Sequence, residues 1–401
     1  MPQSFVRVAA LAVATLIFAS TGCTRREADD PRRPIVETYA DIVLATYEDA
    51  LSTAGALDAA VDALIAQPSE QTLATARDRW KAARIPYSYS EAFRYYAGPI
   101  DREGGPEGQL NGWPLDENHI DAVREGYNAA PGLDIIGNPQ QFPEITPALI
   151  AEQNEAGGEK NIASGYHAIE FLLWGQDRND PPEAAGQRPY TDYVGDNEAN
   201  KRRGQYLKAA TQLLIQDLEG LIKEWRKPPP GSSNYRSELV NGDVYTGLKR
   251  MFTGIATLSE VEMAGERMNV PLLSGDQEEE QSCFSDTTAA DMRNDGLGID
   301  HVYFGRYTRA DGTTVSGPSL AKLVRDKDPR VADEMEARLA RTREALTAIK
   351  DPFDREIQPD NKDGNARIQA AIDSLRAQTQ SFTRTAQALQ IFLSPNESEG
   401  D

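Results

Sequence analysis

Cysteine and histidine are scarce in this sequence. The 401 residues contain two cysteines, Cys23 and Cys283, and three histidines, His119, His167 and His301. Two cysteines exclude the dense disulfide framework that staples small secreted domains. The motif His-Glu-x-x-His, which places two zinc-binding histidines on one helix of a metallopeptidase, does not occur. Any metal site in this chain must therefore draw largely on oxygen ligands.

Positive charge is also in deficit. Lysine and arginine total 42 against 63 aspartates and glutamates, which gives a formal net charge of −21. This balance argues against a nucleic-acid partner and against binding to an anionic membrane surface. The chain is too long for one typical core, and its composition, 39% hydrophobic and 26% charged, is ordinary for soluble globular proteins. We therefore expect two domains.

The N-terminus has the pattern of a secretory signal. Arg7 precedes an apolar run over residues 8–19 that has the length of a signal-peptide core. The run is too short to span a bilayer as a helix of the mature protein. We expect a signal peptide over residues 1–22 that is cleaved.

The apolar run leads into Ser-Thr-Gly-Cys, and small residues ahead of a cysteine resemble the bacterial lipobox. Leucine usually stands where Ser20 does. We expect Cys23 to be lipidated and residues 23–33 to form a polar tether. A plain secretory peptide with an incidental cysteine is the alternative. If Cys23 is acylated, Cys283 has no disulfide partner in the chain.

Helical spacing dominates the remaining sequence, and strand signals are few. Ser69 stands as an N-cap, and "HVYFGRY" (301–307), ahead of an Asp311-Gly312 turn, is the best candidate for a small β-hairpin. The spacing predicts an all-α fold with helices over residues 35–47, 69–84, 145–156, 161–175, 197–227, 243–268, 281–295, 317–350 and 368–393.

The clearest break in the helical pattern is "RKPPPGSSNY" (226–235), because three prolines followed by Gly-Ser-Ser cannot continue a helix. We place a domain boundary there. The prediction is an N-terminal helical domain over residues 34–230 and a C-terminal helical bundle over residues 231–395.

The segment "GYHAIEFLLWGQD" (165–177) carries two ionisable side chains on an almost wholly apolar helix. At 100° per residue, His167, Glu170 and Trp174 share one stripe, and only Asn161 and Ala168 face outward. Ionisable groups in an interior need partners. Three interpretations supply them: a structural hydrogen-bonded pair, a metal site on which the two side chains converge, or the acid–base pair of an enzyme.

This segment resembles the Gly-x-His-x-x-Glu signature of the imelysin family, bacterial envelope proteins that include insulin-cleaving membrane proteases, iron-regulated proteins and relatives of periplasmic iron-uptake components. Further blocks resemble the family in the same order: "PYSYSEAFRYYAGPID" (86–101), "GPEGQLNGWPLDE" (105–117) and "SCFSDTTAADMRND" (282–295). The resemblance covers most of the mature chain. It implies an all-helical protein of two bundle-like halves, with a metal or ligand site where they meet and with His167 and Glu170 contributing.

The sequence departs from the family at residues 285–289. Related proteins tend to read Ser-Asp-Asn-Thr-His there, whereas this chain reads Ser-Asp-Thr-Thr-Ala, so Ala289 replaces a second histidine. His119 and His301 lie at positions that vary in the family. The missing histidine therefore weighs against strong transition-metal binding and against a zinc site with two histidines and a glutamate.

The polar residues of the matching blocks define an oxygen-rich candidate site. One imidazole with several carboxylates suits iron, with zinc or calcium as alternatives. Each residue also has a structural explanation: Asp286 as a helix N-cap, Arg94 paired with Glu91, and "GPEG" (105–108) as a turn. Asp116 and Glu117 are weaker candidates. The expected metal ligands are His167 and Glu170, and the expected ligand-binding residues are Glu91, Arg94, Asp101, Glu107, Asp286 and Asp291.

These observations predict a lipid-anchored envelope protein that binds a metal, iron above all, at the domain interface in support of uptake. Its lipid anchor would hold it on the periplasmic side of the outer membrane or at the cell surface, and an iron-uptake receptor or permease is the expected partner. Two alternatives stay open: a zinc-dependent metallopeptidase of the imelysin type, and a module for a non-metal ligand in which His167 and Glu170 only form hydrogen bonds.

Overall fold

The computed structural model describes residues 30–123, 134–177 and 184–393. The expected signal peptide and Cys23 lie outside these residues. The fold is all-α, as predicted, with one two-stranded antiparallel sheet. None of the described helices is both long and apolar enough to cross a membrane.

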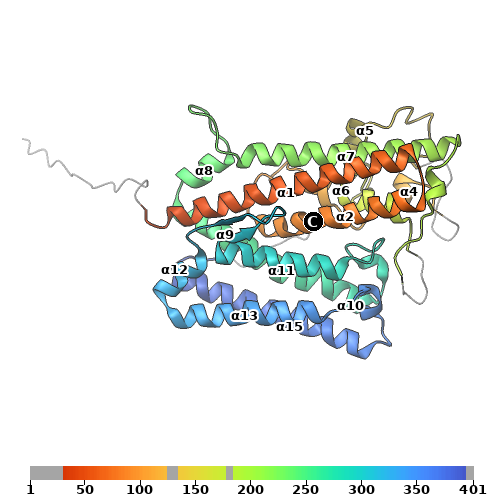
Figure 1. The fold of residues 1–401 in the computed structure, drawn as a ribbon. Helices are drawn as coiled ribbons and strands as arrows, with labels where there is room; N and C mark the ends of the chain where they lie inside the picture. Colours follow the sequence, from red (N-terminus) through yellow and green to blue (C-terminus); the bar gives the residue numbers. More distant parts are fainter. Residues whose placement is uncertain (1–29, 124–133, 178–183, 394–401) are drawn as a thin grey trace, which may run out of the picture.

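The helices form two layers that lie one above the other (Figure 1). In one layer, α1(Arg33–Ala66) packs along α2(Glu70–Ser90) and α7(Glu198–Trp225). In the other, α15(Lys362–Ala388) packs along α13(Pro329–Ala348) and the π-helical segment η4(Leu258–Asn269). The layers meet where α11(Thr288–Phe304) packs against α2. Residues that are far apart in the sequence therefore come together at this junction.

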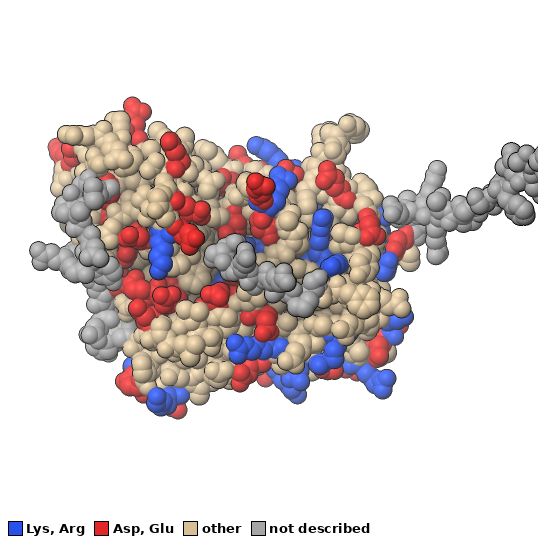
Figure 2. Space-filling model, turned by 180° about the vertical axis from the view of Figure 1, so that it is seen from behind, with Lys and Arg blue, Asp and Glu red and all other residues tan. Residues whose placement is uncertain are grey.

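Shorter elements complete both layers. The first layer includes η2(Glu91–Phe93), α3(Glu107–Asn111), α4(Glu117–Ile120), α5(Pro147–Gln153), α6(Gly165–Trp174), η3(Tyr190–Tyr193) and α8(Tyr235–Asn241). The second includes α9(Val244–Thr257), α10(Val270–Ser274), η5(Gln277–Glu279), α12(Leu320–Lys327) and α14(Phe353–Ile357). On the face seen in Figure 2, acidic side chains are widespread and gather toward the level between the layers.

Local sequence explains several helix boundaries. Ser69 caps α2 as predicted. Its hydroxyl oxygen accepts from the Thr72 backbone N–H at 3.2 Å, and the Ser69 backbone N–H donates to the Thr72 hydroxyl at 2.9 Å. The predicted apolar stripe of the first helix is buried, with Tyr39, Val43 and Tyr47 each at most 1% exposed. These side chains form part of one continuous core.

The segment predicted as a helix over 281–295 is helical only from Thr288 onward. Residues 281–287 form turns, in which Asp286 has φ +57° and the Ser285 N–H donates to Glu170 at 2.9 Å. The hydrogen bond from Ser285 to Glu170 and the left-handed conformation of Asp286 thus hold this segment in turns where a helix was expected. Asp286 is therefore not the N-cap of α11, a position that Thr287 occupies.

The predicted strand over 301–307 is shifted. α11 continues to Phe304, and Gly305 ends it at φ +62°, a conformation that favours glycine. The hairpin then pairs β1(Arg306–Thr308) with β2(Thr314–Ser316) around the expected Asp-Gly turn. The helix predicted over 317–350 is two helices, α12 and α13, because Pro329 begins the second one.

The expected boundary at 226–235 coincides with a loop. α7 ends at Trp225 and α8 begins at Tyr235, and residues 229–233 between them are exposed. Beyond the loop, α8 and the hairpin return to pack on α1. The division into domains over 34–230 and 231–395 stays a prediction.

Candidate functional site

The helix α6 is buried on every side. All residues from Gly165 to Trp174 are buried, so the expectation that Ala168 faces outward is wrong. Close packing at its N-terminus requires glycine, because a Cβ at Gly165 would lie 2.4 Å from the Leu110 carbonyl oxygen and Gly165 has φ +78°. Since α3, α2 and α7 all pack around α6, its polar side chains point into the protein interior.

His167 and Glu170 form a hydrogen-bonded pair. His167 Nδ1 lies 2.8 Å from Glu170 Oε2, and both side chains are at most 2% exposed. The other carboxylate oxygen, Oε1, accepts from the Ser285 N–H at 2.9 Å and from the Ser285 hydroxyl at 2.6 Å. These two donors favour the carboxylate form of Glu170, and in that form Nδ1–H donates to Oε2 while Nε2 keeps its lone pair.

The imidazole is neutral, and its second nitrogen can accept a metal ion when Glu170 is ionised. Burial and the nearby Arg84 guanidinium hold the pKa of His167 well below its usual value of 6.5. Burial raises the pKa of Glu170 to about 8, while the Ser285 hydroxyl and Arg84 oppose this rise. His167 Nε2 is buried and has no hydrogen-bond partner among the described residues.

A buried network of arginines and carboxylates lies beside this pair. Glu91, which is 1% exposed, accepts from Arg94 at 2.9 Å and forms an ion pair with Arg267. Arg94 also pairs with Glu107 at 2.9 Å, and Arg267 with Asp295 at 3.0 Å. The guanidinium groups of Arg94 and Arg267 outweigh burial and lower the pKa of Glu91 to about 2.

A second part of the network joins α2 to α11. Arg84 pairs with Asp291 at 2.9 Å, and both side chains are at most 3% exposed. Ser282 donates its hydroxyl to Asp291 at 2.6 Å, and Arg84 also donates to the Asn111 side chain at 2.6 Å. Arg84 and Asp291 are among the charges that act on the His167 imidazole, so this network and the pair share one interior region.

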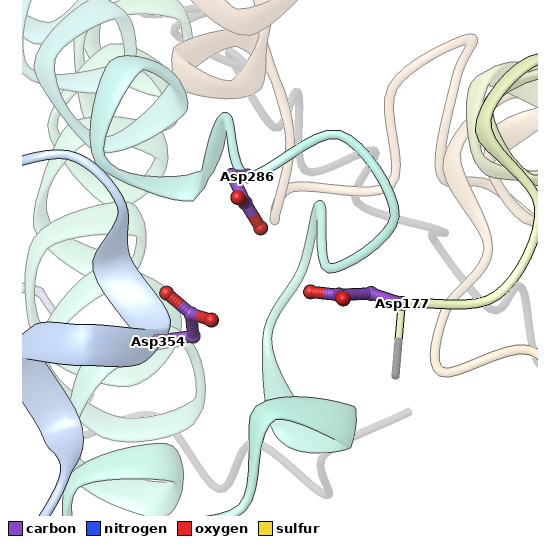
Figure 3. A group of neighbouring side chains, drawn as sticks. All are labelled: Asp177, Asp286 and Asp354. Carbon is purple, nitrogen blue, oxygen red and sulfur yellow. The ribbon is translucent and has the colours of Figure 1, made fainter. Parts of the chain in front are cut away.

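The structure thus brings together most of the residues expected from the sequence. Glu91, Arg94, Glu107 and Asp291 lie in the network, and the predicted pairing of Arg94 with Glu91 is present. Asp101 does not join the network. Its carboxylate accepts hydrogen bonds from backbone N–H groups of a tight turn, including that of Gly98 at 2.7 Å. Asp286 points toward Asp177 and Asp354 (Figure 3).

Sequence reasoning missed four buried polar residues at this site. They are Arg84, Asn111, Arg267 and Asp295. Only weak sequence patterns mark Asp295 and Arg267 as site residues. Asp295 follows Asp291 by one helical turn, and Arg267 lies in an otherwise amphipathic helix. Their partners come from other elements, so spacing along the chain could not identify them.

The other two histidines have structural roles. His119 Nε2 lies 2.9 Å from the Gln153 carbonyl oxygen. His301 packs edge-to-face against Tyr89 and Tyr307, at centroid distances of 4.9 and 5.1 Å. Asp116, a weaker candidate, caps α4 by accepting the Asn118 N–H. Each of these side chains therefore has a local partner of its own.

The sequence profile of the imelysin family matches residues 43–382. The chain belongs to the imelysin family. It is 27% identical over 370 residues to iron-regulated protein A of Synechococcus elongatus, an alignment that covers 90% of this chain and 87% of that protein.

Two solved structures have the same fold as this imelysin. A putative iron-regulated protein A precursor from Parabacteroides distasonis superimposes with a TM-score of 0.71 at 24% identity, over 89% of this chain and 94% of that one. An imelysin-like protein from Psychrobacter arcticum gives a TM-score of 0.62 at 16% identity, over 91% and 98% of the two chains. At these identities the likeness establishes the fold alone.

Proposed function

We propose that this imelysin binds a metal ion, iron in the first place, at the junction of its two layers in support of uptake. The observation that carries the proposal is the state of His167. Its ring is neutral, Nδ1 is tied to a carboxylate, and the buried Nε2 has no partner among the described residues. Metal-binding histidines use this arrangement, because the carboxylate fixes the tautomer and strengthens the free nitrogen as a ligand.

Glu170 has two tasks in this proposal. Oε2 orients His167, and Oε1 holds the turn at Ser285. It was expected as a direct ligand, and we propose that it acts on the ion chiefly through His167. Glu91 and Asp291 contribute negative charge to the same interior, which the arginines partly neutralise.

The remaining ligands of such an ion would come from outside the chain. His167 belongs to no group of three ligand atoms close enough to share one ion within the described residues. Water or a chelating molecule would then complete the coordination. A mixed nitrogen–oxygen environment of this kind suits iron, and an incompletely enclosed ion suits a protein that passes its metal to a partner.

We further propose that the protein works in the bacterial envelope, anchored through lipidated Cys23 on the periplasmic side of the outer membrane or at the cell surface. The apolar run ahead of Cys23 supports export, and the net charge of −21 suits cation handling and opposes nucleic-acid binding. The similarity to an iron-regulated protein supports iron over other metals. The expected partner is an iron-uptake receptor or permease.

One observation favours a second candidate function, the binding of a polar ligand without a metal. Arg94 Nε and Arg267 Nε are buried, and like His167 Nε2 they have no hydrogen-bond partner among the described residues. A small ligand with acceptor and donor groups could satisfy all three atoms. The zinc-peptidase alternative has no comparable support, because His119 is hydrogen-bonded to the Gln153 carbonyl and neither His119 nor His301 belongs to a group of three possible metal ligands among the described residues.

Calorimetric titration distinguishes these candidates. Fe²⁺ is titrated without oxygen into the wild type, His167→Ala and Glu170→Gln, with His119→Ala as a matched control. With Ca²⁺ in excess to occupy any all-oxygen site, we expect one binding event in the wild type and the control, loss of binding in His167→Ala, and about 10–100-fold weaker binding in Glu170→Gln, because an outer carboxylate tunes its histidine. Equal binding by the wild type and His167→Ala would contradict the ligand assignment.

A further inference from the structure

A cluster of carboxylates lies apart from the His167 pair, where the chain leaves α6. Asp177 follows this helix, Asp286 belongs to the turns before α11, and Asp354 lies in α14. One oxygen of each carboxylate lies within 4.8 Å of the other two. Figure 3 shows the three side chains pointing toward a common space from three separate segments. Asp177 is 3% and Asp354 is 1% exposed, so the cluster is largely shielded from water.

Glu280 is an independent sign that this space receives a ligand. It is 2% exposed, and among the described residues it has no ion pair and no well-aligned hydrogen bond, although the Thr288 hydroxyl lies close enough to act on it. Burial raises its pKa, and Asp354, Asp286 and Asp177 raise it further, while the Thr288 hydroxyl opposes them. Glu280 therefore lies close enough to the cluster for its carboxyl group to be affected by the charge of the three aspartates. A buried acid without an ion pair is costly when charged, so Glu280 must either be protonated or be offset by a cation.

The raised pKa values of the clustered aspartates also indicate that a bound cation would stabilise their charged forms. Burial raises the pKa of Asp286 to about 8, with a further contribution from Asp354 and Asp177. Burial likewise raises the pKa of Asp354 to about 6. Lys81 acts on Asp286 in the opposite sense but forms no described ion pair with it. Carboxylates this close cannot all be ionised unless protons or a cation compensate them.

We infer that Asp177, Asp286 and Asp354 form an all-oxygen site for a hard divalent cation of the calcium or manganese class, with Glu280 as a further carboxylate. Such cations take oxygen ligands from several segments and tolerate irregular geometry. The site has no nitrogen ligand and is distinct from His167. It also goes beyond the proposed function, because it would stand without any metal at His167.

The site is coupled to the His167 pair through the chain. Ser285, which holds Glu170, immediately precedes Asp286, whose φ of +57° turns its side chain toward Asp354. A cation here would tie the segment after α6, a helix that packs on α2 and α7, to α14, a helix that packs on α15 in the other layer. Binding should therefore stabilise the fold as well as fill the site.

Calorimetric titration with Ca²⁺ and with Mn²⁺ tests this inference. The variants are Asp286→Asn and Asp354→Asn, and the control is Asp78→Asn, which changes an exposed aspartate of α2. We expect one site in the wild type and in Asp78→Asn, and at least tenfold weaker binding in both cluster variants. His167→Ala should retain the site, which separates this result from the test of iron binding.

Melting temperatures measured with and without Ca²⁺ test the inference even if one variant folds poorly. Without cation, both cluster variants should melt no lower than the wild type, because each removes a carboxyl group that repels its neighbours whenever it is ionised. Ca²⁺ should raise the Tm of the wild type and of His167→Ala but not of the cluster variants; if one variant does not fold, the other decides. Absence of Ca²⁺ and Mn²⁺ binding in the wild type, or unchanged binding in a folded cluster variant, would overturn the inference.

Discussion

Replacement of Glu91 by glutamine should reveal how strongly the buried network holds the fold together. Glu91 is 1% exposed and pairs with Arg94 and Arg267, which come from η2's end and from η4. Glutamine keeps the size of the side chain and removes its charge. Neither arginine can lose its proton to compensate, so positive charge would be left in excess in the interior.

The size of the effect follows from the pKa of Glu91. The two arginines lower this pKa from 4.5 to about 2 in the folded protein. At about 1.4 kcal/mol per pKa unit, the charged form contributes roughly 3 kcal/mol to the free energy of unfolding. This value agrees with the cost of removing one partner from a buried ion pair, which is about 3–5 kcal/mol. Because the folded pKa is depressed, this contribution is complete above pH 4.5 and is lost as the pH falls toward 2.

Urea unfolding followed by circular dichroism measures this contribution. At pH 7, Glu91→Gln should unfold about 3 kcal/mol more easily than the wild type, and the difference should shrink as the pH falls below 4.5. Glu219→Gln is the control, because Glu219 is exposed on α7 and its replacement should cost less than about 0.5 kcal/mol. A loss below about 1 kcal/mol at pH 7, or a loss that does not change with pH, would refute the reasoning.

Three further predictions concern the anchor, the linker and a histidine. Cys23→Ser should release the protein from the membrane fraction or block its processing, and unchanged membrane association would exclude the lipoprotein hypothesis. Limited proteolysis should cut within the exposed loop at 229–233 before any helix, and cleavage within a helix while this loop stays intact would contradict the prediction. Burial lowers the pKa of His301 to about 4. Below about pH 6.5 the His301 side chain takes up a proton in the unfolded chain but not in the folded protein. The free energy of unfolding of the wild type should therefore fall by up to about 3 kcal/mol between pH 6.5 and 4. In denaturant titrations, His301→Phe should remove this part of the pH dependence.

The sequence was informative where a feature depends on neighbours along the chain. Helical spacing predicted the all-α fold, and the i,i+3 spacing of His167 and Glu170 predicted that the two side chains meet. The Ser69 cap and the Asp-Gly hairpin turn were predicted for the same reason. In each case the physical cause acts over a few residues.

Features that depend on tertiary contacts were not predictable in this way. Residues 281–287 have a helical pattern, but the bonds from Ser285 to Glu170 hold them in turns. Arg267 meets Glu91 across 176 residues of sequence, and no local pattern marks it as a partner. Asp354 joins Asp177 and Asp286 only because the tertiary fold brings α14 beside the segments that follow α6 and precede α11. Long-range packing decides such contacts.

The most direct test of metal binding at His167 is diffraction from crystals soaked in iron. Data collected on both sides of the iron absorption edge give an anomalous difference map in which only iron contributes a peak. The account predicts a peak within bonding distance of His167 Nε2, lost in His167→Ala crystals. A map with no peak at Nε2, or with iron bound only at another place such as the carboxylates of Asp177, Asp286 and Asp354, would contradict the claim.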